Sequence, residues 1–280
     1  MHHQVAKLIE QDKESPAQRT EGWYKMRDNC LTASAVATAL GQNKYEKPEG
    51  LIITKCGFGE FKGNQFTEHG NKYEDEARML YEERYGEKTH ELGLLPHPTI
   101  DFLAGSPDGV TESGRLIEIK CPLVRKIEDD VPEHYMPQLQ LLMEIMDLDV
   151  CDFIQYKPLN LTWPGPAEFS VVEVVRERDW FSDNLPFMRA FWDRVLWHRI
   201  HGIEDIKPKK RVKKVKPEKP QVDVKCMIEA SQTPASASAW VDEESTPYHD
   251  KEAVCSRGDT GVKCELPPRT EESQNWYDDS

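Results

Sequence analysis

The sequence has no uninterrupted apolar run of the roughly 18 residues that a membrane-spanning helix requires. It does not open with a positively charged stretch followed by a short apolar one, so we expect no cleaved secretory signal. Its seven cysteines are scattered, odd in number and never spaced as CxxC. We therefore expect neither a disulfide framework nor a structural zinc site, but an intracellular protein with reduced thiols.

Positively charged residues are outnumbered by negatively charged ones. The chain has 36 lysines and arginines against 50 aspartates and glutamates, which is a formal net charge of -14. This balance argues against a protein that merely coats nucleic acid. The charge is unevenly placed, however, with a net of -13 in residues 1–206, +7 in residues 207–220 and -8 in residues 221–280.

The distribution of apolar residues follows the same divisions. Aromatic and aliphatic residues are dense up to about residue 203 of the 280, which is enough for one sizeable core. We expect a folded domain over 1–206, a basic linker over 207–220 and an acidic, largely disordered tail over 221–280. The linker sequence is compatible with nonspecific phosphate contact, a nuclear localisation signal or a solvated tether. The sequence does not decide among these three.

Periodicity and turn residues predict an α/β or α+β fold, with a mixed central sheet flanked by helices. A helix over 33–40 is expected to be capped by Thr32 and ended by Gly41. The remaining predicted elements are helices over 68–85, 136–146 and 178–200, the last kinked or split at Pro186, an apolar run at 102–104, and strands at 116–120, 151–157 and 169–175.

The segment that carries chemistry runs from Ser106 to Pro122. Asp108 lies in a Pro-Asp-Gly turn, and Glu118 and Lys120 lie two residues apart in the following strand. Since side chains alternate along a strand, Glu118 and Lys120 share one face, and we expect that face to lie near Asp108 across a hairpin.

Carboxylates gathered beside a lysine suit metal-assisted hydrolysis of a phosphodiester. Carboxylate oxygens hold Mg²⁺, and the cation polarises the phosphate and lowers the pKa of water. A nearby lysine orients or deprotonates the water and offsets developing charge. The alternative is a surface hairpin with an ordinary Glu–Lys pair, and the spacing alone leaves both interpretations open.

The chain resembles the lambda-type exonucleases, also called YqaJ-like viral recombinases, of the PD-(D/E)xK nuclease superfamily. The similarity lies in four ordered elements: Trp23 and Arg27 followed by residues 31–34 (LTAS); Gly70 and Glu74; Pro107 and Asp108 with Glu118, Ile119, Lys120, Cys121 and Pro122; and Gln138 with Gln140. The resemblance implies a restriction-endonuclease-like core.

The resemblance also implies roles for individual residues. The metal ligands, for Mg²⁺ or Mn²⁺, would be Asp108, Glu118, Glu74 and the backbone carbonyl of Ile119. Lys120 and Gln138 would complete the catalytic set, with Gln138 positioning the water or the lysine. From the residues alone, Glu74 could instead be an ordinary glutamate near a helix start, and Gln138 a buried structural amide.

Arg27 and Ser34 form a second candidate group. Ser34 falls in the first turn of the predicted helix over 33–40, and an arginine can add a charge-assisted fork to an anion there. The plain alternative is a capped helix beside a solvated arginine. By resemblance, the two residues would bind the 5′-terminal phosphate of the degraded DNA strand.

We therefore expect a Mg²⁺-dependent 5′→3′ exonuclease that degrades one strand of linear double-stranded DNA to 5′-mononucleotides in viral or phage-type recombination and repair. The resemblance points to a homotrimer and to a single-strand annealing protein as partner. The expected location is the host cytoplasm, or the nucleus if 207–220 is a localisation signal. Alternatives are a nuclease of other polarity, an endonuclease, or a noncatalytic DNA-binding adaptor.

Overall fold

The computed structural model describes residues 1–59 and 65–207. The predicted acidic tail, and all of the predicted basic linker except Lys207, lie outside the described residues, so the proposed domain boundaries stay predictions. The described helices are α1 (His3–Asp12), α2 (Glu21–Asp28), α3 (Ala33–Ala39), α4 (Pro48–Lys55), α5 (Gln65–Tyr85), the 3-10 turn η1 (Glu133–Tyr135), α6 (Met136–Met146), α7 (Leu159–Thr162) and α8 (Arg178–His201). Within the described ranges, no helix is both long and apolar enough to cross a membrane.

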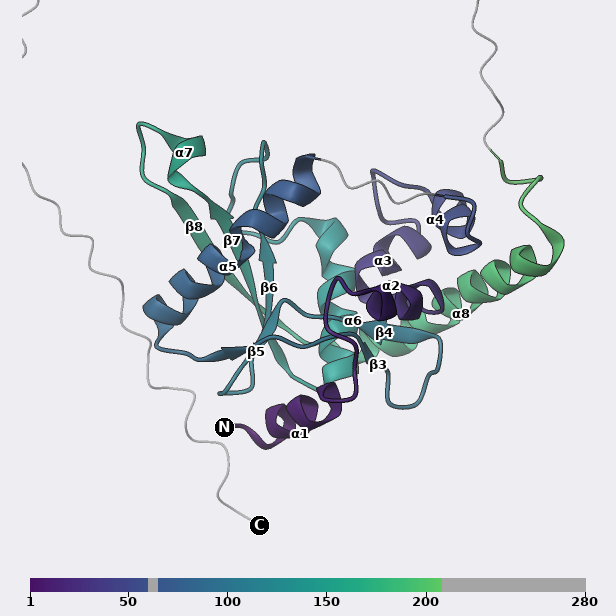
Figure 1. Cartoon of the computed structure of the whole chain (residues 1–280), viewed down its shortest axis with the longest axis horizontal. Helices are drawn as coiled ribbons and strands as arrows, with labels where there is room; N and C mark the ends of the chain where they lie inside the picture. Colours follow the sequence, from purple (N-terminus) through teal and green to yellow (C-terminus); the bar gives the residue numbers. More distant parts are fainter. Residues whose placement is uncertain (60–64, 208–280) are drawn as a thin grey trace, which may run out of the picture. The chain divides into compact units, whose positions relative to one another are not determined.

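The strands form two sheets (Figure 1). They are β1 (Leu31–Thr32), β2 (Thr89–His90), β3 (Leu95–Pro96), β4 (Leu103–Gly105), β5 (Gly109–Thr111), β6 (Leu116–Lys120), β7 (Val150–Lys157) and β8 (Glu168–Val175). The larger sheet has the order β2-β5-β6-β7-β8, in which only β6 and β7 are parallel. The smaller sheet has the order β1-β4-β3. The expected mixed sheet flanked by helices is thus confirmed.

The two faces of the larger sheet are covered by different helices, as strand alternation requires. On one face, Tyr73, Ala77 and Tyr81 of α5 pack against Ile117 and Ile119 of β6. On the opposite face, Leu116 and Phe153 join the main core with residues of α3, α6 and α8. Glu118 lies on this second face because it follows Leu116 by two positions in β6.

Most expected elements are present within one to three residues of their predicted ends, but two details differ. Thr32 precedes α3 as predicted, yet its side chain makes no capping hydrogen bond, and its Oγ1 lies 3.3 Å from Oγ of Ser34 instead. The helix α8 runs unbroken through Pro186, so it is not split there. Pro186 is exposed, and buried Met188 and Phe191 anchor the following turns to the core.

Candidate active site

The β5–β6 hairpin brings Asp108 beside the middle of β6. Gly109 pairs with Ile117 in antiparallel register, which places the preceding Asp108 next to the last residues of β6. Oδ2 of Asp108 accepts a hydrogen bond from the backbone N–H of Ile119 at 2.6 Å. The side chain is thereby held at the end of the strand that carries Glu118 and Lys120.

Glu118 is a buried carboxylate, with only 1% of the residue exposed. Its Oε1 accepts hydrogen bonds from Nζ of Lys120 and Nε2 of Gln138, while its Oε2 is buried and has no hydrogen-bond partner among the described residues. This burial excludes the surface-hairpin interpretation. A buried carboxylate oxygen without a donor is costly unless another ligand satisfies it.

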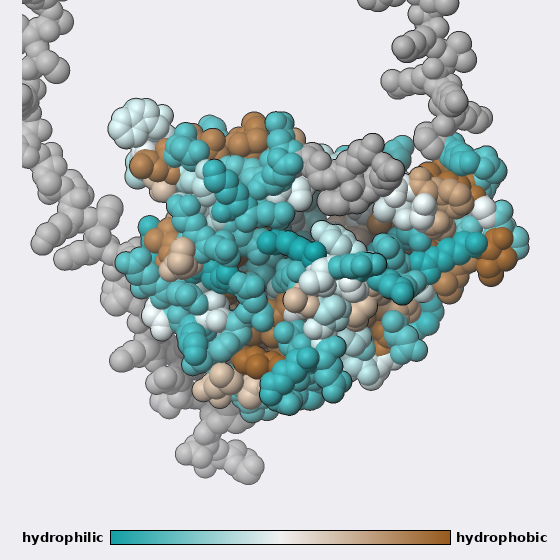
Figure 2. Space-filling model, in the orientation of Figure 1, coloured by the Kyte–Doolittle hydropathy of each residue, from teal (hydrophilic) through white to brown (hydrophobic). Residues whose placement is uncertain are grey.

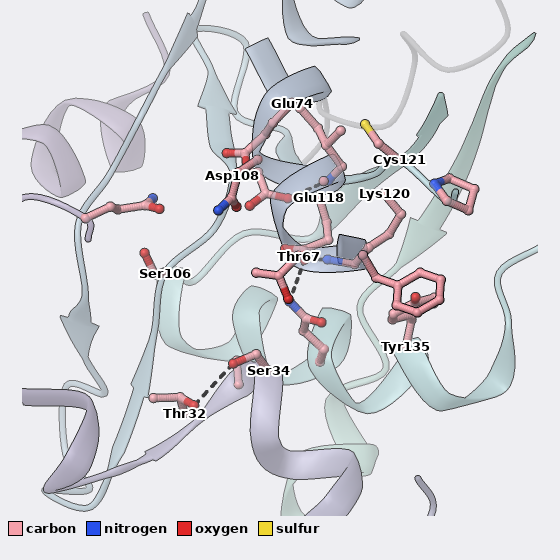
Figure 3. A pocket seen from close by; sticks show the side chains of 18 of the residues that line it. Thr32, Ser34, Thr67, Glu74, Ser106, Asp108, Glu118, Lys120, Cys121 and Tyr135 are labelled. Carbon is pink, nitrogen blue, oxygen red and sulfur yellow. Dashed lines mark hydrogen bonds and ion pairs between the residues drawn. The ribbon is translucent and has the colours of Figure 1, made fainter. Parts of the chain in front are cut away.

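Glu74 reaches the same place from α5 (Figure 3). The side chains of Glu74, Asp108 and Glu118 point toward one another from a helix, a turn and a strand. Burial and the neighbouring carboxylate of Asp108 raise the pKa of Glu118 to about 8 and the pKa of Glu74 to about 7. Such mutual repulsion is what a bound cation relieves.

Lys120 is the positive partner of this cluster. Burial lowers its pKa, but the facing carboxylates of Glu118 and Asp108 outweigh burial and raise the pKa above its ordinary value. Its Nζ also lies 5.4 Å from the ring centre of Tyr135. The side chain therefore remains an ammonium group at neutral pH.

These residues fit a hard divalent cation. Among the described residues, no three His, Cys, Asp or Glu side chains are placed as a ready metal cage. Mg²⁺ is commonly held in a different way, through one or two carboxylates with water and substrate oxygens completing its shell. The unpaired oxygen of Glu118 and the raised pKa values of two carboxylates match that kind of site.

Arg27 and Ser34 meet on the other side of the same cleft. Nη2 of Arg27 donates to Oγ of Ser34 at 3.0 Å, and the guanidinium carbon lies 4.3 Å from the ring centre of Trp23. The stacked indole and the hydroxyl hold the guanidinium in one orientation. Burial lowers the pKa of Arg27, although arginine stays charged at neutral pH.

One cavity of about 1040 Å³ joins the two groups, because Arg27 and Ser34 line it together with Asp108, Glu118 and Lys120. On the face shown in Figure 2, mostly hydrophilic side chains border the hollow between α5 and the helices α2 and α3. The cleft thus has an acidic end and a cationic end within one continuous space.

The two glutamines of the predicted helix are separated by the structure. Gln138 reaches Glu118, whereas Gln140 is buried, donating to the carbonyl of Val175 at 3.0 Å and accepting from the N–H of Glu177 at 2.8 Å. Gln140 therefore joins α6 to the end of β8. Arg19 and Tyr135 are among the cleft residues that were absent from the sequence-based site. No local pattern marks Arg19, while Tyr135 lies one turn before Gln138.

Part of the chain matches a known protein family. Residues 22–149 match the model of the YqaJ-like viral recombinase domain. Arg27, Ser34, Glu74 and the Asp108–Glu118–Lys120 group all lie within the matched residues, whereas Arg19 lies before them.

Viral proteins and a solved bacterial structure are similar to this chain. The uncharacterized protein R354 of Acanthamoeba polyphaga mimivirus is 36% identical over 159 residues, which are 50% of this chain and 29% of that protein. Protein D345L of African swine fever virus (strain Badajoz 1971 Vero-adapted) is 27% identical over 161 residues, 46% of either chain. The chain thus spans less than half the length of both curated relatives.

One structural relative is the alkaline exonuclease LHK-Exo from Laribacter hongkongensis. It superposes with a TM-score of 0.55 and 26% identity over 65% of this chain and 95% of that one. A second structure of LHK-Exo, in complex with dAMP, gives a TM-score of 0.56 with the same identity and coverage. The expected family resemblance is confirmed by these matches.

Proposed function

We propose that the chain is a Mg²⁺-dependent 5′→3′ exonuclease that degrades one strand of linear double-stranded DNA to 5′-mononucleotides. The observation that carries the proposal is the single cleft in which the Asp108–Glu118–Lys120 cluster and the Arg27–Ser34 pair both lie. The alkaline exonuclease activity named for the structural relative, and the dAMP bound to it, support the same reaction.

In this proposal Asp108, Glu118 and Glu74 would hold the cation, with the backbone carbonyl of Ile119 as a further ligand. When bound, Mg²⁺ polarises the phosphodiester and lowers the pKa of water. Lys120 stabilises negative charge that develops on the phosphate, because its raised pKa keeps it protonated. This favours an electrostatic role for Lys120 over a role as the base.

Gln138 acts on the geometry of the site. Its amide N–H donates to the same oxygen of Glu118 that Lys120 contacts. One oxygen of the carboxylate is thereby engaged by two donors, and Oε2 would be the oxygen that holds the cation. We assign Gln138 as a positioning residue on this ground.

The direction of digestion depends on the cationic end of the cleft. The guanidinium of Arg27 and the hydroxyl of Ser34 can both donate to a terminal phosphate, in the charge-assisted manner typical of arginine. A 5′-terminal phosphate held there places the neighbouring phosphodiester toward the carboxylates. This arrangement requires a free DNA end and removes one nucleotide at a time.

Digestion of end-labelled linear duplex with Mg²⁺ tests the proposal. The intact chain should release labelled mononucleotide from the 5′ end and leave closed circular duplex uncut. Release from the 3′ end, or cutting of the circle, would replace the proposal with a nuclease of other polarity or an endonuclease. Binding of duplex without any Mg²⁺-dependent cleavage would indicate a noncatalytic adaptor.

Arg27→Ala tests the proposed phosphate pocket independently of the catalytic cluster. We expect about a tenfold selective loss on 5′-phosphorylated ends, the loss of one charge-assisted contact. The matched control is Lys25→Ala, which removes an exposed charge from the same helix. Equal losses on 5′-phosphate and 5′-hydroxyl substrates would overturn the assignment of this pocket.

Lys120→Ala tests the catalytic role directly. We expect cleavage to fall by at least about a hundredfold, the usual effect of removing a transition-state charge partner. Binding of duplex DNA should change far less. Undiminished cleavage would contradict the mechanism, although not the fold.

We also propose several properties that the family resemblance implies. They include assembly as a homotrimer, partnership with a single-strand annealing protein, a role in viral DNA recombination and repair, and action inside the host cell. Light scattering of the purified chain would show a trimer or a monomer. The viral relatives are consistent with the proposed setting.

A further inference from the structure

Arg19 has a backbone conformation that side chains other than glycine rarely adopt. Its φ angle is +65°, and in the described part of the chain only Asp147 shares a positive φ among residues other than glycine. A residue held in this region costs about 1 kcal/mol or more in backbone strain, and such residues cluster at functional sites. Glycine at position 19 would avoid that cost.

The chain on both sides of Arg19 is held in place. Nε2 of Gln18 donates to the carbonyls of Leu92 at 2.7 Å and Pro107 at 3.3 Å, directly before Asp108. On the other side, Oγ1 of Thr20 accepts from the N–H of Trp23 at 3.3 Å and caps α2. Arg19 therefore lies between the turn that carries Asp108 and the helix that carries Arg27.

From this position the Arg19 side chain enters the cleft and pairs with Glu74. Its Nη2 lies 2.8 Å from Oε2 of Glu74, and the two side chains are 48% and 22% exposed. The other carboxylates that face Glu74 across the cleft are Asp108 and Glu118. The guanidinium is thus a positive charge, reachable from solvent, at the edge of a crowded acidic cluster.

We propose that Arg19 is a displaceable counter-ion of this cluster: its guanidinium holds the Glu74 carboxylate while the site is free of metal and releases it when a divalent cation binds. The inference rests on the proposed function, because it takes Glu74 as a ligand of that cation. It goes further by assigning a positioning role to a residue outside the matched domain.

The pairing has two opposite effects on cation binding. It keeps the Glu74 carboxylate at the cleft rather than turned away, and it makes the cation compete with a guanidinium for the same oxygen. A half-exposed ion pair is weak enough to be exchanged, since such pairs are worth little in water. We expect the competition to outweigh the orienting effect, so removal of the guanidinium should make cation binding tighter.

Arg19→Gly is the informative variant. It removes the guanidinium and keeps the backbone conformation, so the full chain should be at least as heat-stable as the wild type. We expect its dissociation constant for Mn²⁺, measured by electron paramagnetic resonance of the free ion, to fall about fivefold, the value of one exposed ion pair. Arg19→Lys, which retains the charge, should return the dissociation constant toward that of the wild type.

A matched control separates the specific pair from the general loss of positive charge. Arg84→Ala also removes one arginine, from the far end of α5, where the guanidinium lies over Phe169. It should leave Mn²⁺ affinity unchanged. An unchanged or weaker affinity in Arg19→Gly, or an equal gain in Arg84→Ala, would overturn the inference about Arg19.

The same titration distinguishes failure of this inference from failure of the proposed function. If the wild-type chain binds Mn²⁺ and Arg19→Gly binds it no better, only the counter-ion role is lost. If the wild-type chain binds no Mn²⁺ at all, the metal-dependent function and the counter-ion role both fall.

Discussion

At the scale of single residues, the buried acid Glu118 links protein stability to pH. Its pKa is about 8, raised chiefly by burial and next by Asp108, against an ordinary value of 4.5. Between these values the folded state binds more protons than the unfolded state, so stability falls as pH rises. With divalent cations chelated, we expect the Tm to fall from pH 5 to pH 8 by about 3 °C more in the wild type than in Glu118→Gln, corresponding to about 1 kcal/mol. Thermal unfolding at several pH values measures this difference. Glu83→Gln, on the exposed side of α5, is the control, and equal slopes in wild type and Glu118→Gln would contradict the prediction.

At the scale of elements, side chains of two other helices donate hydrogen bonds to the C-terminal end of α2. Lys55 of α4 donates to the carbonyl of Arg27, and Arg199 of α8 donates to the carbonyls of Asp28 and Lys55. These cations satisfy carbonyls at two helix ends and complement both dipoles. We expect Arg199→Ala to lower the Tm by about 2–4 °C and to weaken the preference for 5′-phosphorylated DNA ends, because α2 positions Arg27. Arg194→Ala, which breaks an exposed pair with Glu49, should do neither. Lost stability with an intact end preference would limit Arg199 to a structural role.

At the scale of the whole molecule, the placement of charge matters more than its total. Residues 207–220 carry +7 and residues 221–280 carry -8, and both segments fall beyond the helix α8. If the acidic segment competes with DNA for the basic one, deleting 221–280 should tighten duplex binding at low salt and steepen its salt dependence. Fluorescence anisotropy at several salt concentrations measures both effects. Deleting 207–280, which removes the basic segment too, should reverse the gain in DNA affinity. If deleting 221–280 leaves the affinity unchanged, the acidic segment does not compete with DNA.

Much of the site was predictable because it depends on local geometry. The positions of Asp108, Glu118 and Lys120 follow from a turn and from alternation along one strand, both of which are properties of neighbouring residues. The helix that carries Gln138 was equally clear from its apolar periodicity. The helices α1, α2 and α4 were not predicted, since they are short and their burial is imposed by distant partners.

The sequence by itself determined which chemical groups are available and which of them share a face. Periods of two along strands and of about 3.6 along helices require only local information. The tertiary structure alone decided that Glu74 meets Asp108 and Glu118, that Arg19 pairs with Glu74, and that Arg199 supports α2 from 171 residues away. The physical reason is that burial and charge repulsion arise from neighbours in space, and these raise the pKa values of Glu74 and Glu118. The net charge of -14 indicated little about the partner, whereas the location of three acids in one cleft indicates a great deal.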